Sequence, residues 1–175
     1  MNKTLVYLSL GGNIDNPAHN LHKALTALQR SSQIYDLKFS HFYLTAPVEV
    51  QASSDFVNVV CSLETTLSLN DLFKLTESIE IQLGKVPKPK IASRPIDIDL
   101  LFYGDQSYQT ETLKIPHPRW KERLFVLYPL KDLISEISLR EEEKIANYKI
   151  KDLIDKLTRE TPQSVSLLEK NPFLH

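Results

Sequence analysis

Two aspartates, Asp97 and Asp99, carry the clearest chemistry in this chain, because they interrupt an apolar run within residues 94–104. On a β-strand alternate side chains share a face, so both carboxylates would point the same way, about 6.6 Å apart. Hard divalent cations such as Mg²⁺ are bound by one or two carboxylates together with substrate phosphates. The alternative is an edge strand whose acids only keep it soluble. The opposite face of this strand would carry Ile96, Ile98, Leu100 and Phe102.

A basic loop leads into this acidic strand. Residues 85–90 contain three lysines and two prolines, a composition that excludes a helix and disfavours a paired strand. Cations beside paired acids would compete with a lone metal, but they fit a polyphosphate that bridges the metal and the cations. Arg94 offers a planar fork that suits bidentate phosphate binding. For Lys88 and Lys90 we favour a solvated loop.

Two further cationic side chains follow the strand. His117 lies between Pro116 and Pro118, which restrict its backbone and suit a group held in a fixed position. From there it could donate a hydrogen bond to a phosphate. A structural or merely exposed histidine is the competing interpretation, and a surface arginine is the default for Arg123.

Asn58 lies inside an apolar run, where an amide needs hydrogen-bond partners. Its donors and acceptor suit the amide edge of a heterocycle, and Phe56, two positions earlier, shares its face and could stack on a flat ring. An asparagine bonded to a neighbouring loop backbone is equally consistent with the pattern.

The elements that must position these residues alternate between strands and helices. Predicted strands are Thr4–Leu10, a short one in Phe39–Leu44, Phe56–Thr65 and the acidic strand; predicted helices begin at Asn16-Pro17 and at Ser68. The resulting order, β-α-β-β-α-β, is typical of a ferredoxin-like α+β fold with an antiparallel sheet and flanking helices. A further amphipathic helix is predicted near Ile150–Leu157. We expect a single domain over residues 1–160 and a loosely held tail over residues 161–175.

Composition excludes several classes of protein. The 175 residues are 42% hydrophobic and 25% charged, as in ordinary globular domains, and the net charge of −1 argues against a nucleic-acid partner. No apolar run approaches the roughly 20 residues of a membrane span, and no secretory signal is apparent. Cys61 is expected to be a buried thiol. A cytoplasmic protein fits these features.

Five motifs in a fixed order resemble those of the 6-hydroxymethyl-7,8-dihydropterin pyrophosphokinase family. They cover roughly residues 4 to 135, and the last is followed by Phe125-Val126-Leu127. The motifs are Leu10–Asn13, Phe42–Pro47, Asp55–Asn58, Arg94–Asp99 and Pro116–Pro118. The resemblance implies the ferredoxin-like fold and transfer of pyrophosphate from ATP to the hydroxymethyl group of the pterin, giving AMP and the pterin diphosphate in folate biosynthesis. Neighbouring enzymes of that pathway are further partners it suggests.

The resemblance also implies roles for individual residues. Asp97 and Asp99 would bridge two Mg²⁺ ions on the ATP phosphates, with Arg94 and Lys85 at catalytic positions. The pterin would be bound by Thr45, Pro47, Val48, Phe56, Asn58 and Phe125, with the two phenylalanines on either side of its ring. ATP would be bound by Glu80, Arg94, Leu100, His117 and Arg123.

The chain departs from the family pattern at three positions. Lys85 replaces a catalytic arginine and lacks its bidentate fork, Ile91 stands where a tryptophan often closes over the site, and Gly12 replaces a small polar residue. We expect these changes to alter loop closure and rate. A non-catalytic pterin- or nucleotide-binding homologue is the main alternative; a ferredoxin-like interaction module and a two-metal nuclease are weaker ones.

Overall fold

An antiparallel sheet forms the centre of the protein in the computed structural model, which describes residues 2–47, 54–86 and 93–168. Over these residues the sheet has the strand order β10-β3-β4-β1-β5, with β2 paired to the far part of β4. Its strands are β1 (Thr4–Gly12), β2 (Ile34–Phe39), β3 (Tyr43–Thr45), β4 (Phe56–Thr65), β5 (Asp97–Tyr103) and β10 (Val165–Leu167). The predicted ferredoxin-like α+β arrangement is confirmed.

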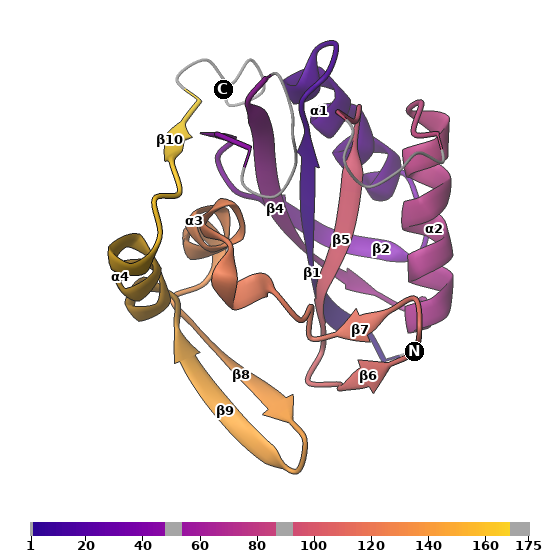
Figure 1. The fold of residues 1–175 in the computed structure, drawn as a ribbon. Coiled ribbons are helices and arrows are strands. Elements are labelled where there is room, and N and C mark those ends of the chain that lie inside the picture. The colour runs from indigo at the N-terminus through magenta and orange to yellow at the C-terminus, as the bar shows by residue number, and fades with distance from the viewer. Residues whose placement is uncertain (1, 48–53, 87–92, 169–175) are drawn as a thin grey trace.

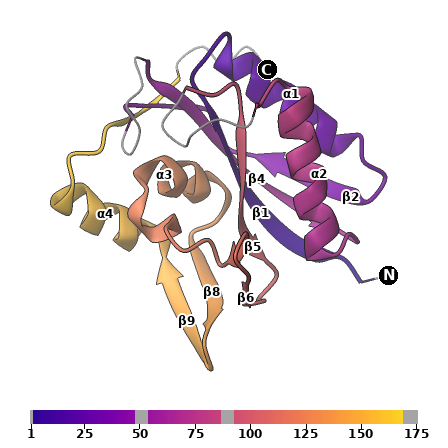
Figure 2. The same ribbon diagram turned by 45° about the vertical axis from the view of Figure 1, so that its right-hand side comes forward.

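Helices cover both faces of this sheet (Figures 1 and 2). On one face, α1 (Pro17–Gln29) and α2 (Leu69–Gln82) enclose a core that includes Leu8, Leu10 and Ile98. On the other, α3 (Leu124–Leu133) and α4 (Ile150–Glu160) pack with the short helix η1 (Trp120–Glu122). Alternate side chains along β1 and β5 therefore point into two separate cores, one on each face of the sheet.

The helix starts follow the predicted capping residues. Asn16 accepts a hydrogen bond from the His19 N–H at 3.2 Å, and Pro17 occupies the first helical position. Ser68 accepts from the Asp71 N–H at 3.2 Å. Gly84 follows α2 with a φ of 95°, a left-handed conformation that favours glycine and ends the helix.

Two predictions about the strands are wrong in detail. Phe102 lies on the same side as Asp97 and Asp99 rather than with Ile98, because a register shift inserts Leu101 as an extra residue opposite β1. Such a bulge reverses the side-chain alternation beyond it. The short strand predicted within Phe39–Leu44 is split into β2 and β3 by the segment 40–42.

The C-terminal part adds two hairpins, a helix and a strand. The hairpins are β6 (Tyr108–Gln109) with β7 (Lys114–Ile115), and β8 (Glu136–Glu141) with β9 (Lys144–Lys149), which projects from the sheet in Figure 1. The amphipathic helix predicted near residue 150 is confirmed as α4. The loosely held tail is corrected in part, because β10 pairs with β3 at the sheet edge. Among the described helices none is long and apolar enough to cross a membrane.

Candidate active site

A row of residues crosses three strands on the α3 side of the sheet. In β1, Gly11 pairs with Asp97 of β5 on one side and with Asn58 of β4 on the other. Cross-strand partners share a face, so the acidic strand and the buried amide of Asn58 face the same space. A Cβ atom on Gly11 would lie 2.6 Å from Asn58 Oδ1, which is closer than side chains tolerate. Glycine at this position therefore leaves room for the Asn58 amide.

Asp97 is held between two cations. Its Oδ1 lies 2.6 Å from Lys85 Nζ, and its Oδ2 bonds to Arg94 Nη1. Burial lowers the pKa of Lys85, but hydrogen bonds to Asp97 and Glu80 outweigh it and leave that pKa above its ordinary value. Lys85 therefore carries a positive charge at neutral pH, and both Lys85 and Arg94 contact Asp97.

Glu80 supports this cluster from α2. It is 7% exposed, accepts the Ile98 N–H at 2.6 Å and binds Lys85 Nζ at 2.9 Å. Burial raises the Glu80 pKa, although the bonds from Ile98 and Lys85 partly offset this effect. Glu80 thus joins α2, β5 and Lys85, and it holds the lysine against the acidic strand.

Asp99 is more open than Asp97. Its side chain is 48% exposed and pairs with Arg123 Nη1 at 3.8 Å. Desolvation by the surrounding protein raises the pKa of Asp99, and the negative charge of Asp97 raises it further. The charges of His117 and Arg123 lower this pKa, but not enough to cancel the increase. An exposed carboxylate whose charge is poorly compensated suits a cation from solution.

The two aspartates fit a Mg²⁺ site of the kind completed by a phosphate. In the described ranges, no three His, Cys, Asp or Glu side chains cluster closely enough to hold a metal by themselves. Mg²⁺ is commonly bound by one or two carboxylates, with substrate phosphates and water supplying the rest. Two carboxylates on one sheet face, flanked by cations, are consistent with that mode.

His117 is held by the backbone around it. Its N–H donates to the Leu101 carbonyl at 2.9 Å, and its ring Nδ1 accepts the Arg119 N–H at 3.1 Å. An accepting Nδ1 carries no proton, so in the neutral ring the proton is on Nε2. His117 in its neutral form therefore presents Nε2–H as a hydrogen-bond donor.

Three of the predicted pterin residues, Thr45, Phe56 and Asn58, lie together on the β4 side of Gly11. Asn58 is 4% exposed and donates from Nδ2 to Thr45 Oγ1 at 2.7 Å, and Thr45 pairs with Phe56 across the strands. Phe125, at the start of α3, lies under the Arg123 guanidinium, 5.4 Å from ring centroid to Cζ. Half-buried phenylalanines thus come from two elements, β4 and α3.

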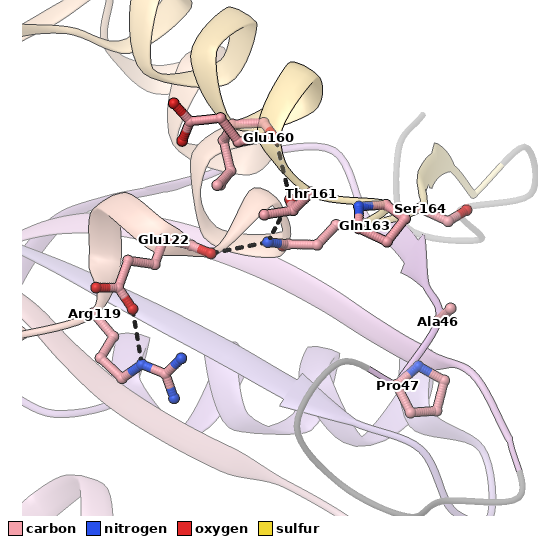
Figure 3. A pocket seen from close by; sticks show the side chains of 10 residues that line it. Ala46, Pro47, Arg119, Glu122, Glu160, Thr161, Gln163 and Ser164 are labelled. Atoms are coloured by element: carbon pink, nitrogen blue, oxygen red, sulfur yellow. Dashed lines mark hydrogen bonds and ion pairs between the residues drawn. The ribbon is translucent and has the colours of Figure 1, made fainter.

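Three predicted residues need separate comment. Leu100 is 3% exposed and packs in the core under α1 and α2, so its side chain does not face the site. Pro47 lines a cavity of about 660 Å³ between β3 and the segment after α4 (Figure 3). Val48 lies outside the described residues, as do Lys88, Lys90 and Ile91.

Asn13, at the end of the first motif, ties the end of β1 to the segment that leads into β5. Asn13 is 5% exposed. Its N–H donates to the Arg94 carbonyl at 3.0 Å, and its Oδ1 accepts the Arg94 N–H at 2.9 Å. Its Nδ2 donates to Ser93 Oγ at 3.2 Å. Ser54 Oγ donates to the Asn13 carbonyl at 2.8 Å. An asparagine directly after two glycines at a strand end was the available signal.

Comparisons with known proteins agree with this geometry. A family model described as 7,8-dihydro-6-hydroxymethylpterin-pyrophosphokinase matches residues 7–135. The 2-amino-4-hydroxy-6-hydroxymethyldihydropteridine pyrophosphokinase of Haemophilus influenzae is 36% identical over 133 residues, covering 76% of this chain and 83% of that protein. The Bacillus subtilis protein of the same name is 33% identical over 133 residues, covering 76% and 80%.

A solved structure shares the fold. Plasmodium falciparum HPPK-DHPS superimposes with a TM-score of 0.70 at 16% identity, over 91% of this chain. This chain spans 45% of that longer protein. At such low identity the likeness concerns the fold alone.

Proposed function

The chain belongs to the 7,8-dihydro-6-hydroxymethylpterin-pyrophosphokinase family, and on that premise we propose which of its residues bind each substrate. The protein is a 2-amino-4-hydroxy-6-hydroxymethyldihydropteridine diphosphokinase of folate biosynthesis. It transfers pyrophosphate from ATP to the hydroxymethyl group of the pterin, giving AMP and the pterin diphosphate. The reaction needs two binding regions side by side, one for phosphates and one for a flat heterocycle.

One observation carries the assignment of residues: Asp97 and Asn58 flank the same glycine. Neighbouring strands are about 4.8 Å apart, so these two positions are separated by roughly 10 Å across the sheet. A pterin held at Asn58 would therefore place its hydroxymethyl arm toward a triphosphate held at Asp97. Gly11 between them adds no side chain to block the approach.

In this proposal the pterin is bound on the β4 side. Asn58 Nδ2 is engaged by Thr45, which orients the amide so that its Oδ1 can accept an N–H from the pterin edge. Phe56 and Phe125 would stack on either side of the ring, and Pro47 and Val48 would border it. The burial of the Asn58–Thr45 pair favours a ligand that replaces water with matched hydrogen bonds.

The phosphates are bound on the β5 side. Asp97 and Asp99 would hold two Mg²⁺ ions, which when bound neutralise phosphate oxygens and polarise the transferred group. Arg94, Arg123 and the Nε2–H of His117 would donate to phosphate oxygens, while Lys85 would move from Asp97 to a phosphate. Glu80 would orient Lys85 next to the nucleotide, and Leu100 would contribute through its main chain. Positioning and charge neutralisation supply the catalysis.

The nucleotide product tests the proposed chemistry. Purified protein is given ATP, Mg²⁺ and the hydroxymethyl pterin, and the nucleotides are separated by chromatography. We expect AMP and pterin diphosphate in equal amounts. ADP in place of AMP would refute pyrophosphoryl transfer, and ligand binding without any AMP would favour the non-catalytic homologue. We further propose the neighbouring enzymes of folate biosynthesis as partners, because a Pisum sativum relative, 36% identical over 129 residues, is named a bifunctional protein of folate synthesis.

A further inference from the structure

Gln163 lies in the segment after α4, beyond residues 7–135 that match the family. Its side-chain amide bonds to the backbone on both sides of Arg123: Oε1 accepts the Leu124 N–H at 2.9 Å, and Nε2 donates to the Glu122 carbonyl at 3.0 Å. Figure 3 shows this side chain reaching toward Glu122. One amide thus brackets the residue that contacts Asp99.

The bracket also completes the start of α3. Arg123 occupies the N-cap position, but its own side chain makes no capping hydrogen bond. The first N–H groups of a helix lack partners within the helix, and capping side chains, water or ligands satisfy them. Gln163 does so for Leu124, the first residue of α3. It therefore fixes the point from which both the Arg123 guanidinium and Phe125 project.

Gln163 is itself held from both directions. Its Nε2 also donates to Thr161 Oγ1 at 3.1 Å, and Thr161 Oγ1 donates to the Leu157 carbonyl at the end of α4 at 3.0 Å. Two residues later, Val165 pairs with Thr45 as β10 joins β3. The segment that carries the Gln163 amide is therefore fixed at one end by α4 and at the other by the sheet. A residue that positions a functional side chain needs such rigid support.

We propose that Gln163 is a positioning residue for pyrophosphoryl transfer, which holds the Arg123 guanidinium over the phosphate site by bracketing its backbone. The inference rests on the proposed function, in which Arg123 binds a phosphate of ATP. Without the bracket the backbone at residue 123 can shift, and a misplaced guanidinium loses its bond to the transferred group. The Arg123 guanidinium is then present but no longer aligned with Asp99.

A double-mutant cycle tests the proposal by varying ATP at saturating pterin. Gln163→Met keeps the length of the side chain and removes the bond to Thr161 as well as the two bonds that bracket Arg123. We expect kcat/KM for ATP to fall roughly tenfold, the size of effect that losing the two bracketing bonds would give. In an Arg123→Ala background the same change should lower kcat/KM less than twofold, because the group it positions is gone. Ser164→Ala, at the exposed neighbouring position, is the matched control and should match the wild type.

The outcomes distinguish a failure of the role of Gln163 from a failure of the phosphate-binding role of Arg123. An equal fall in both backgrounds, or no fall in Gln163→Met while Arg123→Ala is impaired, would overturn the role of Gln163 alone. An unimpaired Arg123→Ala would overturn the phosphate role of Arg123 and the inference with it. If Gln163→Met does not fold, Gln163→Glu replaces it, because the carboxylate still accepts the Leu124 N–H. We expect Gln163→Glu to lower kcat/KM for ATP by less than tenfold, and to have almost no effect in the Arg123→Ala background. An equal fall in kcat/KM with and without Arg123 would refute the proposal.

Discussion

Replacing Gly11 by alanine should separate pterin binding from ATP binding. The added Cβ would lie 2.6 Å from Asn58 Oδ1, so the amide must move by several tenths of an ångström to reach normal contact. Asn58 is 4% exposed and bonded to Thr45 at 2.7 Å, which leaves it little freedom to move without breaking that bond. The substitution therefore acts on the pterin side of the site, while Asp97 on the other side of Gly11 is not contacted by the new atom.

The magnitude follows from the hydrogen bonds at stake. A buried group left without its partner costs about 1–3 kcal/mol, so Gly11→Ala should lower the free energy of unfolding by roughly that amount. Misaligning Asn58 should weaken pterin binding by about the same free energy, or roughly 5- to 150-fold in dissociation constant. Calorimetry with the pterin and, separately, with an ATP analogue should show the first affinity reduced and the second nearly unchanged.

An Asn58→Ala background supplies the control. There the oxygen that Gly11→Ala would meet is absent, so adding the alanine should weaken pterin binding no further. Unchanged pterin affinity in Gly11→Ala, or an equal further loss in the Asn58→Ala background, would refute the reasoning that the glycine makes room for the amide.

Three other predictions follow from the described contacts. Asp99→Asn should raise the melting temperature of the ligand-free protein at pH 7, because a raised Asp99 pKa means that folding disfavours the charged carboxylate. This penalty grows as the pH rises above 3.8 and is complete above the raised pKa, so the gain should vanish below pH 3.8; its persistence there would contradict the pKa argument. Cys61 should resist iodoacetamide at pH 8 until the protein unfolds, because burial raises its pKa to about 12, and mass spectrometry showing rapid labelling would contradict this. Lys85→Met should lower kcat at least about tenfold by removing a cation, whereas Lys85→Arg should retain most of the rate; equal losses would show that charge is not what matters at this position.

Local patterns were enough to predict most of the fold and the acidic half of the site. The alternation around Asp97 and Asp99 indicated a shared face, and Asn16 and Ser68 marked the helix starts by capping chemistry that acts within four residues. Asn58 was a candidate binding residue because an amide within an apolar run needs a hydrogen-bond partner. Its partner, Thr45, depends on strand pairing, which the spacing alone does not specify.

What the sequence could not predict depends on contacts between distant segments. The extra residue Leu101 reverses the facing of Phe102, and no turn residue or proline marks that bulge. β10 is three residues long and forms only because β3 offers an open edge. Gln163 lies 40 residues from Arg123, so its place beside α3 depends on the packing of α4.

The most direct test of the account is the rate of AMP formation in a single turnover by Asp97→Asn and Asp99→Asn. We expect each variant to lose at least about a thousandfold, on the order of 4 kcal/mol, because each removes a ligand of the metal that neutralises the phosphates. Pterin affinity should survive, since Asn58 and Thr45 are untouched. Asp105→Asn, an exposed aspartate just beyond β5, should retain the full rate. A wild-type rate in either Asp97→Asn or Asp99→Asn would contradict the central claim that this acidic pair carries pyrophosphoryl transfer.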